Sequence, residues 1–424
     1  MSDAAPDAPE RRPDVGIRTL LGGDGIRGVG MLLVFFTHLF LLADPGQHNM
    51  LVYGWAAPVL GHIDLGLAAF FVLSGYLISR PFARAYVAGT RRPPLGDYVR
   101  NRVLRVVPAF YVFTVLVLLL FGLDGDLRNL PHADTSAWWQ ILGQFLFVQA
   151  QTGGNAAVPI GPAWSIGAEV GFYVLIPLSA LVAYRVAARV EGQGRRAALA
   201  IAAIAVVTFV SIALRAHDRF TFAWLTSPPA IMYVFMPGVA VAIVEPLLAG
   251  RLRADARLAR RIAWAAFAAS ALAAVVYSAT DYDPEQTPIH HVLGQRALLA
   301  ALCTGALIFG MVVLQLGTER APRLFANRLM LWMGARSYSF YLAHIAVLLE
   351  IEHVLGGESI AARVAIMTAV GLPVTTAIAA LSYRYVERPF LERKRRPVTR
   401  GMDGGPAGPP VGADPLPVGA GPAA

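Results

Sequence analysis

The sequence predicts an all-α, polytopic integral membrane protein with about ten transmembrane helices and both termini in the cytoplasm. Three observations predict this class. The 424 residues are 56 % hydrophobic and 15 % charged, whereas a soluble domain is usually about 45–50 % apolar and about 25 % charged. The apolar residues gather in repeated stretches long enough to cross a bilayer. Arginines gather between alternate stretches, as the positive-inside rule describes.

Stretches of about 17–25 predominantly apolar residues are typical of spanning helices. The ten predicted spans are residues 26–43, 64–82, 105–122, 163–184, 197–214, 229–249, 262–279, 296–316, 331–353 and 364–386. Residues 138–148, which begin with Trp138 and Trp139, are apolar but too short to span. They predict an interfacial helix with its two indoles at headgroup depth.

The charge distribution predicts the orientation and the domain boundaries. With the N-terminus inside, 29 of the 36 Arg and Lys residues fall in cytoplasmic segments and 5 in external ones. Residues 1–25 then form a cytoplasmic tail without a secretory signal peptide, because they are polar. Residues 26–388 form the membrane domain. Residues 389–424 form a basic and then Gly/Pro-rich cytoplasmic tail, which we expect to be disordered.

The first predicted span carries two ionisable residues, Arg27 and His38. They are 11 residues apart, about three helical turns, so they share a face and stand roughly 16–17 Å apart. An arginine at the cytoplasmic mouth suits phosphates, and a buried neutral imidazole suits proton transfer. Alternatively, Arg27 is a positive-inside anchor and His38 is a hydrogen-bonded packing residue.

Glu169 lies about six residues inside the predicted span 163–184. An unpaired carboxylate in hydrocarbon costs several kcal/mol, so Glu169 needs a polar cavity and a partner. His38 lies at a similar depth on an oppositely directed helix. We expect Glu169 to orient the His38 ring and raise its basicity, as a general base requires. A structural hydrogen bond without chemistry is the alternative.

The segment between the second and third spans is strongly basic, from Arg80 to Arg105. Arg102 and Arg105 are three residues apart, so on a helix they are neighbours. Such a cluster suits a polyphosphate ligand through charge-assisted contacts. It equally suits anionic lipid headgroups, and the residues alone leave both interpretations open.

The ninth span carries Ser337, Tyr338, Tyr341 and His344. Small and hydroxyl residues permit close helix packing, so the four are either acceptor contacts or packing residues. His344, at roughly mid-membrane depth, is a second candidate base. We expect no metal site, because the sequence offers no ligand cluster of helical spacing.

Together these segments resemble the membrane-bound acyltransferase 3 family, which O-acylates bacterial surface glycans and some antibiotics. The motifs are Asp24-Gly-Ile-Arg27 with His38, the run Phe70–Ile78, Arg102 with Arg105 and Pro108, Trp164-Ser165 with Glu169, Phe172 and Tyr173, Ser337-Tyr338-Ser339 with Tyr341 and His344, and Tyr385-Val-Glu387-Arg-Pro389. They occur in the family's order over about residues 20–390. One departure is Ala343, where many members carry a tryptophan.

The resemblance implies transfer of an acyl group, often acetyl, from cytoplasmic acyl-coenzyme A to a hydroxyl, without a bound cofactor. It implies that His38 is the catalytic base and that Arg27 contacts the donor. From the basic segment between the second and third spans, we expect Arg80, Arg102 and Arg105 to be further donor contacts. The protein would lie in a bacterial inner membrane and have no nucleic-acid partner. Some relatives carry a C-terminal extracytoplasmic domain; we expect this chain to lack it.

The sequence leaves the acceptor open among polysaccharide, peptidoglycan, a lipid-linked glycan and a macrolide-type small molecule. It also leaves open the acyl chain length, the oligomeric state and the choice between direct transfer and an acylated intermediate. The main alternative function is a transporter or flippase of a modified lipid or glycan, which needs buried polar groups but no coenzyme A site. A structural scaffold is disfavoured by ionisable residues within spans.

Overall fold

The computed structural model describes residues 20–43, 65–121, 138–152, 161–215, 222–279, 289–355 and 357–394. Within these ranges every regular element is a helix, and ten helices are long and apolar enough to cross a membrane. The predicted all-α class and the number of spans are therefore confirmed. Most of the predicted N-terminal tail and residues 395–424 lie outside the described residues.

Nine spans are single long helices, and the tenth is composite. The single helices are α1 (Gly23–Ala43), α3 (Leu65–Ala88), α4 (Leu95–Phe121), α7 (Trp164–Ala187), α8 (Gln193–Arg215), α10 (Pro228–Ala254), α11 (Ala256–Ala279), α12 (Ile289–Thr318) and α15 (Ser337–Leu355). The tenth comprises α16 (Ile360–Ile366), η4 (Met367–Gly371), α17 (Leu372–Ser382), η5 (Tyr383–Glu387) and α18 (Arg388–Lys394). Short helices connect the spans: α5 (Trp138–Phe145), α6 (Gln149–Thr152), η3 (Gly161–Ala163), α9 (Phe222–Leu225), α13 (Arg323–Ala326) and α14 (Arg328–Ala335).

Two helices extend well beyond the predicted spans. α4 begins at Leu95, ten residues before the predicted span 105–122, so Arg102 and Arg105 lie within the helix. At the other end of the chain, α18 continues to Lys394, past the predicted start of the disordered tail at 389. Hydropathy detects only the apolar part of a helix, whereas both helices continue through polar turns outside it. The short helix predicted at 138–148 is present as α5.

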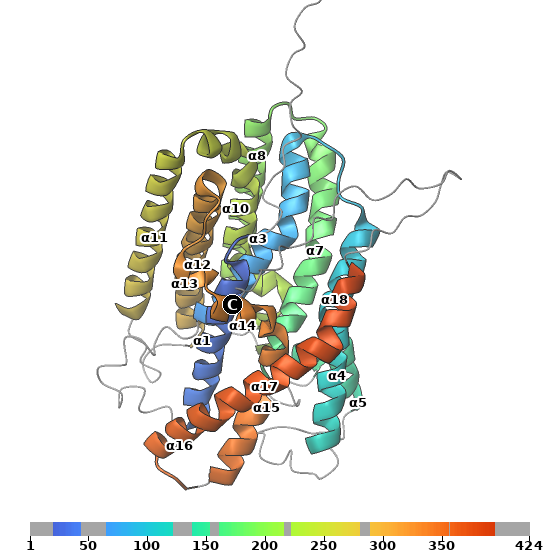
Figure 1. The fold of residues 1–424 in the computed structure, drawn as a ribbon. Helices are drawn as coiled ribbons and strands as arrows, with labels where there is room; N and C mark the ends of the chain where they lie inside the picture. The colour runs from blue at the N-terminus through green and yellow to red at the C-terminus, as the bar shows by residue number, and fades with distance from the viewer. Residues whose placement is uncertain are drawn as a thin grey trace, which may run out of the picture.

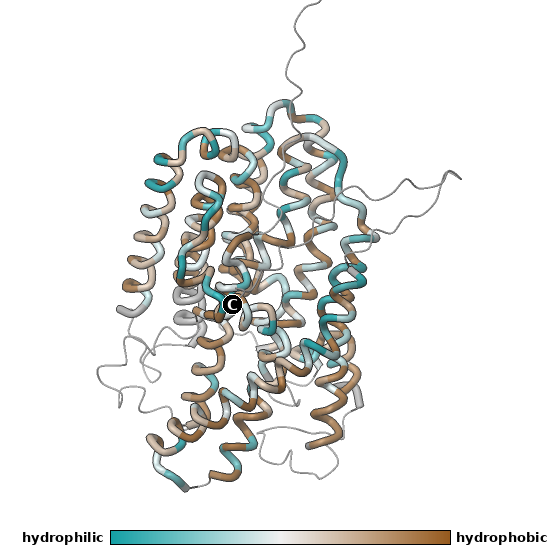
Figure 2. The backbone as a smooth tube through the Cα atoms, in the orientation of Figure 1, coloured by the Kyte–Doolittle hydropathy of each residue, from teal (hydrophilic) through white to brown (hydrophobic). Residues whose placement is uncertain are grey.

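The helices form one bundle in which α11 lies at one side and α4 with α18 at the other (Figure 1). The α7–α8 and α10–α11 connections lie at the top of that view, and the α15–α16 connection lies at the bottom (Figure 1). Hydrophobic residues cover most turns of the long helices (Figure 2). Large apolar side chains face outward, among them Phe209 at 73 % exposed and Trp264 at 68 %, as expected of a surface that faces lipid.

The centre of the bundle is the packing of α3 against α10. Gly75 and Gly238 make it possible, because a Cβ on Gly75 would lie 2.2 Å from the Phe235 carbonyl oxygen. A Cβ on Gly238 would lie 2.0 Å from the Val72 carbonyl oxygen. Small residues that let two backbones approach are typical of membrane helix interfaces. The glycine in the Phe70–Ile78 motif is therefore a packing requirement.

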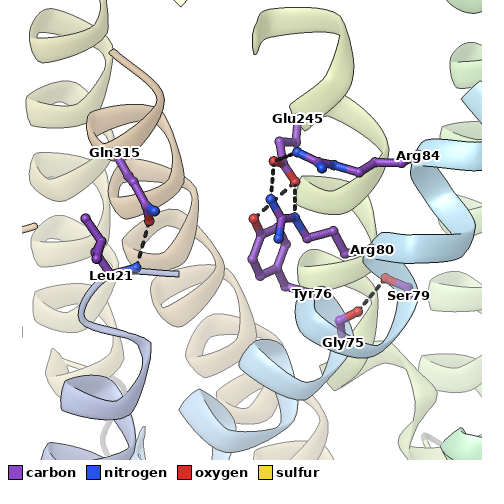
Figure 3. Close-up of polar contacts among 8 residues, drawn as sticks. All are labelled: Leu21, Gly75, Tyr76, Ser79, Arg80, Arg84, Glu245 and Gln315. Atoms are coloured by element: carbon purple, nitrogen blue, oxygen red, sulfur yellow. Dashed lines mark hydrogen bonds and ion pairs between the residues drawn. The ribbon is translucent and has the colours of Figure 1, made fainter. Parts of the chain in front are cut away.

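The start of α1 is held against α13, α14 and α12. A Cβ on Gly25 would lie 1.7 Å from the Phe325 carbonyl oxygen, and one on Gly334 would lie 1.6 Å from the Asp24 carbonyl oxygen. The Leu21 backbone N–H donates to Gln315 Oε1 at 2.8 Å (Figure 3). These contacts fix the position from which Arg27 projects.

Candidate functional site

A polar cavity of about 100 Å³ lies where α1, α3, α4, α7 and α15 meet. A single water needs only about 10–15 Å³, so this space can take a small organic group. Seven of the ten predicted site residues line it: Arg27, Arg102, Arg105, Glu169, Ser337, Tyr338 and Tyr341. Helices far apart in the sequence thus bring the predicted residues together. The other three, Arg80, His38 and His344, lie elsewhere.

Three arginines face the cavity, and their partners differ. Arg27 Nη1 donates to Asp24 Oδ1 at 2.8 Å, one turn earlier on α1. Arg105 Nη1 lies 3.5 Å from Glu387 Oε2. The Arg102 guanidinium lies over the Tyr98 and Tyr173 rings, 5.6 and 5.5 Å from their centroids. Its buried Nε–H has no hydrogen-bond partner in the described part of the chain.

An unpartnered buried donor on a charged group costs about 1–3 kcal/mol or more. The Nε–H of Arg102 therefore indicates a place for an acceptor group that the protein itself does not supply. Because Arg27 and Arg105 line the same cavity, an anionic or strongly polar ligand is favoured there. Arginine binds such groups through charge-assisted hydrogen bonds.

Arg80 does not belong to this group. Its Nε and Nη2 donate to the two oxygens of Glu245 at 2.7 and 2.9 Å (Figure 3). Arg84 and the Tyr76 hydroxyl donate to the same carboxylate, which is fully buried. The predicted donor contact at Arg80 therefore receives no support, because its bidentate hydrogen bonds are already used to join α3 to α10. The spacing of arginines along one segment does not predict that Arg80 pairs with a carboxylate on another helix.

Glu169 lies in the cavity, and both Ser74 and Tyr173 are its hydrogen-bond partners. The Ser74 hydroxyl donates to Glu169 Oε1 at 2.6 Å. α3, which carries Ser74, packs against both α1 and α7. Ser74 thus takes the place beside Glu169 that we expected His38 to fill.

His38 forms its contact with His344 instead. The rings lie 4.9 Å apart between centroids, and His344 Nε2 is 3.3 Å from His38 Nδ1. The expected orientation of His38 by Glu169 is therefore wrong, although both residues lie on the predicted helices. Depths estimated from sequence order do not say which helices are neighbours, and here α15 packs against α1.

The neighbours of the two histidines determine their tautomers when both rings are neutral. His344 Nδ1 is 2.6 Å from the Tyr341 carbonyl oxygen, which only accepts, so this nitrogen carries the proton. His344 Nε2 is then an acceptor, and His38 Nδ1–H donates to it and to the Val34 carbonyl oxygen at 2.9 Å. His38 Nε2 is left with a lone pair, which is the form a general base needs.

Tyr341 connects the cavity to the histidine pair. The Tyr341 hydroxyl donates to the Pro162 carbonyl oxygen at 2.6 Å, so the Ser165 hydroxyl donates to Tyr341 at 2.6 Å. Tyr341 lines the cavity, and its backbone carbonyl binds His344. The Tyr338 hydroxyl donates to the Val106 carbonyl oxygen at 2.8 Å. Both tyrosine hydroxyls thus also pack helices together.

Three polar residues that pair with predicted site residues received no role of their own from the sequence. Ser74, Glu245 and Glu387 all accompany ionisable groups inside spans. Buried carboxylates in a membrane protein are functional or structural signals by default, so Glu245 and Glu387 could have been singled out. In the described residues, no group of three or more His, Cys, Asp or Glu side chains could hold a metal ion.

Comparisons with known proteins show the family to which the chain belongs. The acyltransferase domain family, acyltransferase 3, matches residues 21–384. The chain is 25 % identical over 405 residues to YrhL of Bacillus subtilis, provisionally named a peptidoglycan O-acetyltransferase, covering 90 % of this chain and 56 % of YrhL. It is 23 % identical over 378 residues to the peptidoglycan O-acetyltransferase OatA of Listeria monocytogenes, covering 87 % of this chain and 55 % of OatA.

Proteins of Staphylococcus aureus provisionally named O-acetyltransferases are 24 % identical over 390 residues, which is 88 % of this chain and 58 % of theirs. The chain thus spans a little over half the length of these curated relatives. No solved structure matches the chain significantly.

Proposed function

We propose that this protein transfers an acetyl group from cytoplasmic acyl-coenzyme A to a glycan hydroxyl. The premise is that the chain belongs to the acyltransferase 3 family. The family and the names of the relatives support an O-acyltransferase in a multi-pass membrane protein. The cavity lined by three arginines is the observation that carries the proposed donor.

The donor binds through Arg27, Arg102 and Arg105. Coenzyme A carries phosphate groups and an amide-rich pantetheine arm, and arginine side chains bind both kinds of acceptor. The free Nε–H of Arg102 supplies one donor at no cost to an existing bond. The acyl end enters the cavity toward Tyr341, whose backbone carbonyl binds His344, and toward Ser165, which donates to the Tyr341 hydroxyl.

His38 acts as the general base on the acceptor hydroxyl. Its Nε2 lone pair follows from the tautomers given above, with His344 in place of Glu169 as the orienting group. Proton transfer by such a group accelerates a reaction by typically about 10²–10⁴-fold.

Peptidoglycan is the acceptor that the names of YrhL and OatA suggest. The proposal is therefore tested with purified protein in detergent, acetyl-coenzyme A and soluble peptidoglycan glycan strands. We expect free coenzyme A thiol and ester-linked acetate on the glycan to appear in equal amounts. A transporter or flippase would release no coenzyme A.

The His38→Ala variant should lose about 10²–10⁴-fold in rate while still binding coenzyme A. Thr37→Ala is the matched control. Thr37 is the residue before His38, and its hydroxyl donates to the Leu33 carbonyl oxygen on the same helix. Substantial transfer by well-folded His38→Ala protein would overturn the assignment of the base.

A further inference from the structure

The contact between Ser74 on α3 and Glu169 on α7 differs from the contacts of Ser79 and Ser179 on the same two helices. Ser79 donates to the Gly75 carbonyl oxygen (Figure 3), and Ser179 donates to the Ile176 carbonyl oxygen. Bonds of this kind, to a carbonyl one turn earlier, are how serine usually satisfies itself in a helix. Ser74 instead donates to a carboxylate on another helix, at 2.6 Å.

The pair is placed where a ligand can reach it. Both Ser74 and Glu169 line the cavity, and both side chains are only partly buried. A hydroxyl within hydrogen-bond reach of a base, in a cleft, is the geometry of an activated nucleophile. The Arg102 Nε–H without a partner lies among the residues that line the same cavity, where a cationic donor can stabilise a developing oxyanion.

The two proton-accepting centres of the site are separate. Glu169 contacts Ser74, whereas His38 contacts His344, and neither histidine lines the cavity. A thioester held by the arginines therefore meets Ser74 in the cavity, while the base proposed for the acceptor lies beyond it. Direct transfer from donor to acceptor would use His38 alone as base and leave the Ser74–Glu169 pair without a role in the reaction.

We propose that Ser74 is transiently acylated during the reaction, with Glu169 as its base. This inference rests on the proposed function. Ser74 Oγ forms a C–O bond with the acyl carbonyl carbon as its proton passes to Glu169. The C–S bond breaks and coenzyme A leaves as a thiolate, a good leaving group because an ordinary thiol has a pKa near 8.5.

The second half returns the enzyme to its starting state. The acceptor hydroxyl attacks the Ser74 ester and gives its proton to His38 Nε2. The C–O bond to Ser74 breaks, and Ser74 Oγ regains the proton that Glu169 held. His38 then releases its proton to solvent, where it balances the thiolate formed in the first half.

The experiment is single-turnover labelling of the purified full chain with radiolabelled acetyl-coenzyme A in the absence of acceptor. We expect a burst of free coenzyme A and label on the protein, each approaching one equivalent. The label should map to Ser74 as a 42 Da addition by peptide mass spectrometry. It should be lost in alkaline but not neutral hydroxylamine, as for an oxygen ester.

Matched variants separate the nucleophile from its surroundings. Ser74→Ala should carry no label, whereas Ser79→Ala on the same helix should label like wild type. Ser74→Cys should give a thioester that neutral hydroxylamine removes, which locates the acyl group even if Ser74→Ala folds poorly. Glu169→Gln should form the ester about 10²–10⁴-fold more slowly. His38→Ala should accumulate acyl-Ser74 even with glycan strands present.

Two results overturn the inference. The first is active transfer without acylation of Ser74. It is seen when wild-type protein acetylates glycan strands but shows neither a burst of coenzyme A nor label on the protein, or when Ser74→Ala transfers at the wild-type rate. The acyl group then passes directly from the donor, and the proposed function stands. In the second, no coenzyme A is released with or without glycan strands, and both the inference and the proposed function fail.

Discussion

Glu387 binds Ser339 through two hydrogen bonds: its Oε1 accepts from both the backbone N–H and the hydroxyl of Ser339, 48 residues earlier in the chain. Its other oxygen lies 3.5 Å from Arg105 Nη1. Glu387 ends the π-helical turn η5, and π-turns inside helices often occur at functional sites. This carboxylate therefore connects the last span to the start of α15 and to an arginine of the cavity.

Removing this carboxylate should destabilise the protein. In Glu387→Ala the buried Ser339 N–H loses its acceptor, which costs about 1–3 kcal/mol. Glu387→Gln keeps one acceptor oxygen and should lose less. Thermal unfolding in detergent measures both. Glu392→Ala is the control, because its ion pair with Arg388 is exposed at both ends and is worth about 0–1 kcal/mol. Equal melting temperatures of Glu387→Ala and wild type would contradict the structural role of Glu387.

The Arg80–Glu245 pair should be a structural element and not a donor contact. Glu245→Gln leaves the buried Arg80 charge poorly compensated, and breaking a buried pair typically costs about 3–5 kcal/mol. Replacing both, as Arg80→Met with Glu245→Leu, should recover much of that stability. A double-mutant cycle on unfolding checks the coupling. A higher KM for acyl-coenzyme A in the folded double variant would return Arg80 to the donor site.

Arg102 should contribute to donor binding. A charge-assisted hydrogen bond is worth on the order of 1.5–3 kcal/mol, so Arg102→Ala should weaken coenzyme A binding roughly tenfold or more. Arg102→Ala with Arg105→Ala should weaken it further, with acceptor affinity less affected. Arg100→Ala is the control, since Arg100 donates to the Arg393 carbonyl oxygen and does not line the cavity. Titration calorimetry with coenzyme A measures the change. Unchanged affinity would reassign the arginines to lipid headgroups.

His344 should act by orienting His38. A glutamine at 344 can accept from His38 Nδ1–H through its oxygen and donate to the Tyr341 carbonyl through its nitrogen, whereas leucine can do neither. We expect His344→Leu to lower kcat about tenfold or more, from the loss of a bond worth about 1 kcal/mol and of the tautomer it selects, with donor KM unchanged. His344→Gln should recover most of kcat. Equal losses in the two variants would indicate packing alone.

The orientation of the chain is testable without an activity assay. Because Arg and Lys residues gather in alternate connections, a reporter fused after Val398 should read cytoplasmic and one inserted near Asn155 should read external. Alkaline phosphatase and green fluorescent protein fusions report the two sides. An external reading after Val398 would refute the ten-span orientation.

Much of the architecture could be predicted because it depends on local pattern. The lengths of apolar stretches give the ten helices, since a bilayer of fixed thickness requires about 20 apolar residues per span. Helical periodicity correctly paired Arg102 with Arg105 on one helix, and both line the cavity. The extensions of α4 and α18 could not be predicted in this way, because polar turns beyond the apolar region carry no hydropathy signal.

The sequence by itself determined the helical class, the spans and most of the polar residues that reach the cavity, because each of these depends on residues close together in the chain. Only the tertiary structure decided their partners: His38 with His344, Glu169 with Ser74, and Arg80 with Glu245. These pairs join residues 95 to 306 positions apart. Equal depth in a membrane allows many such pairings, and the packing of α3 between α1 and α7 selects among them.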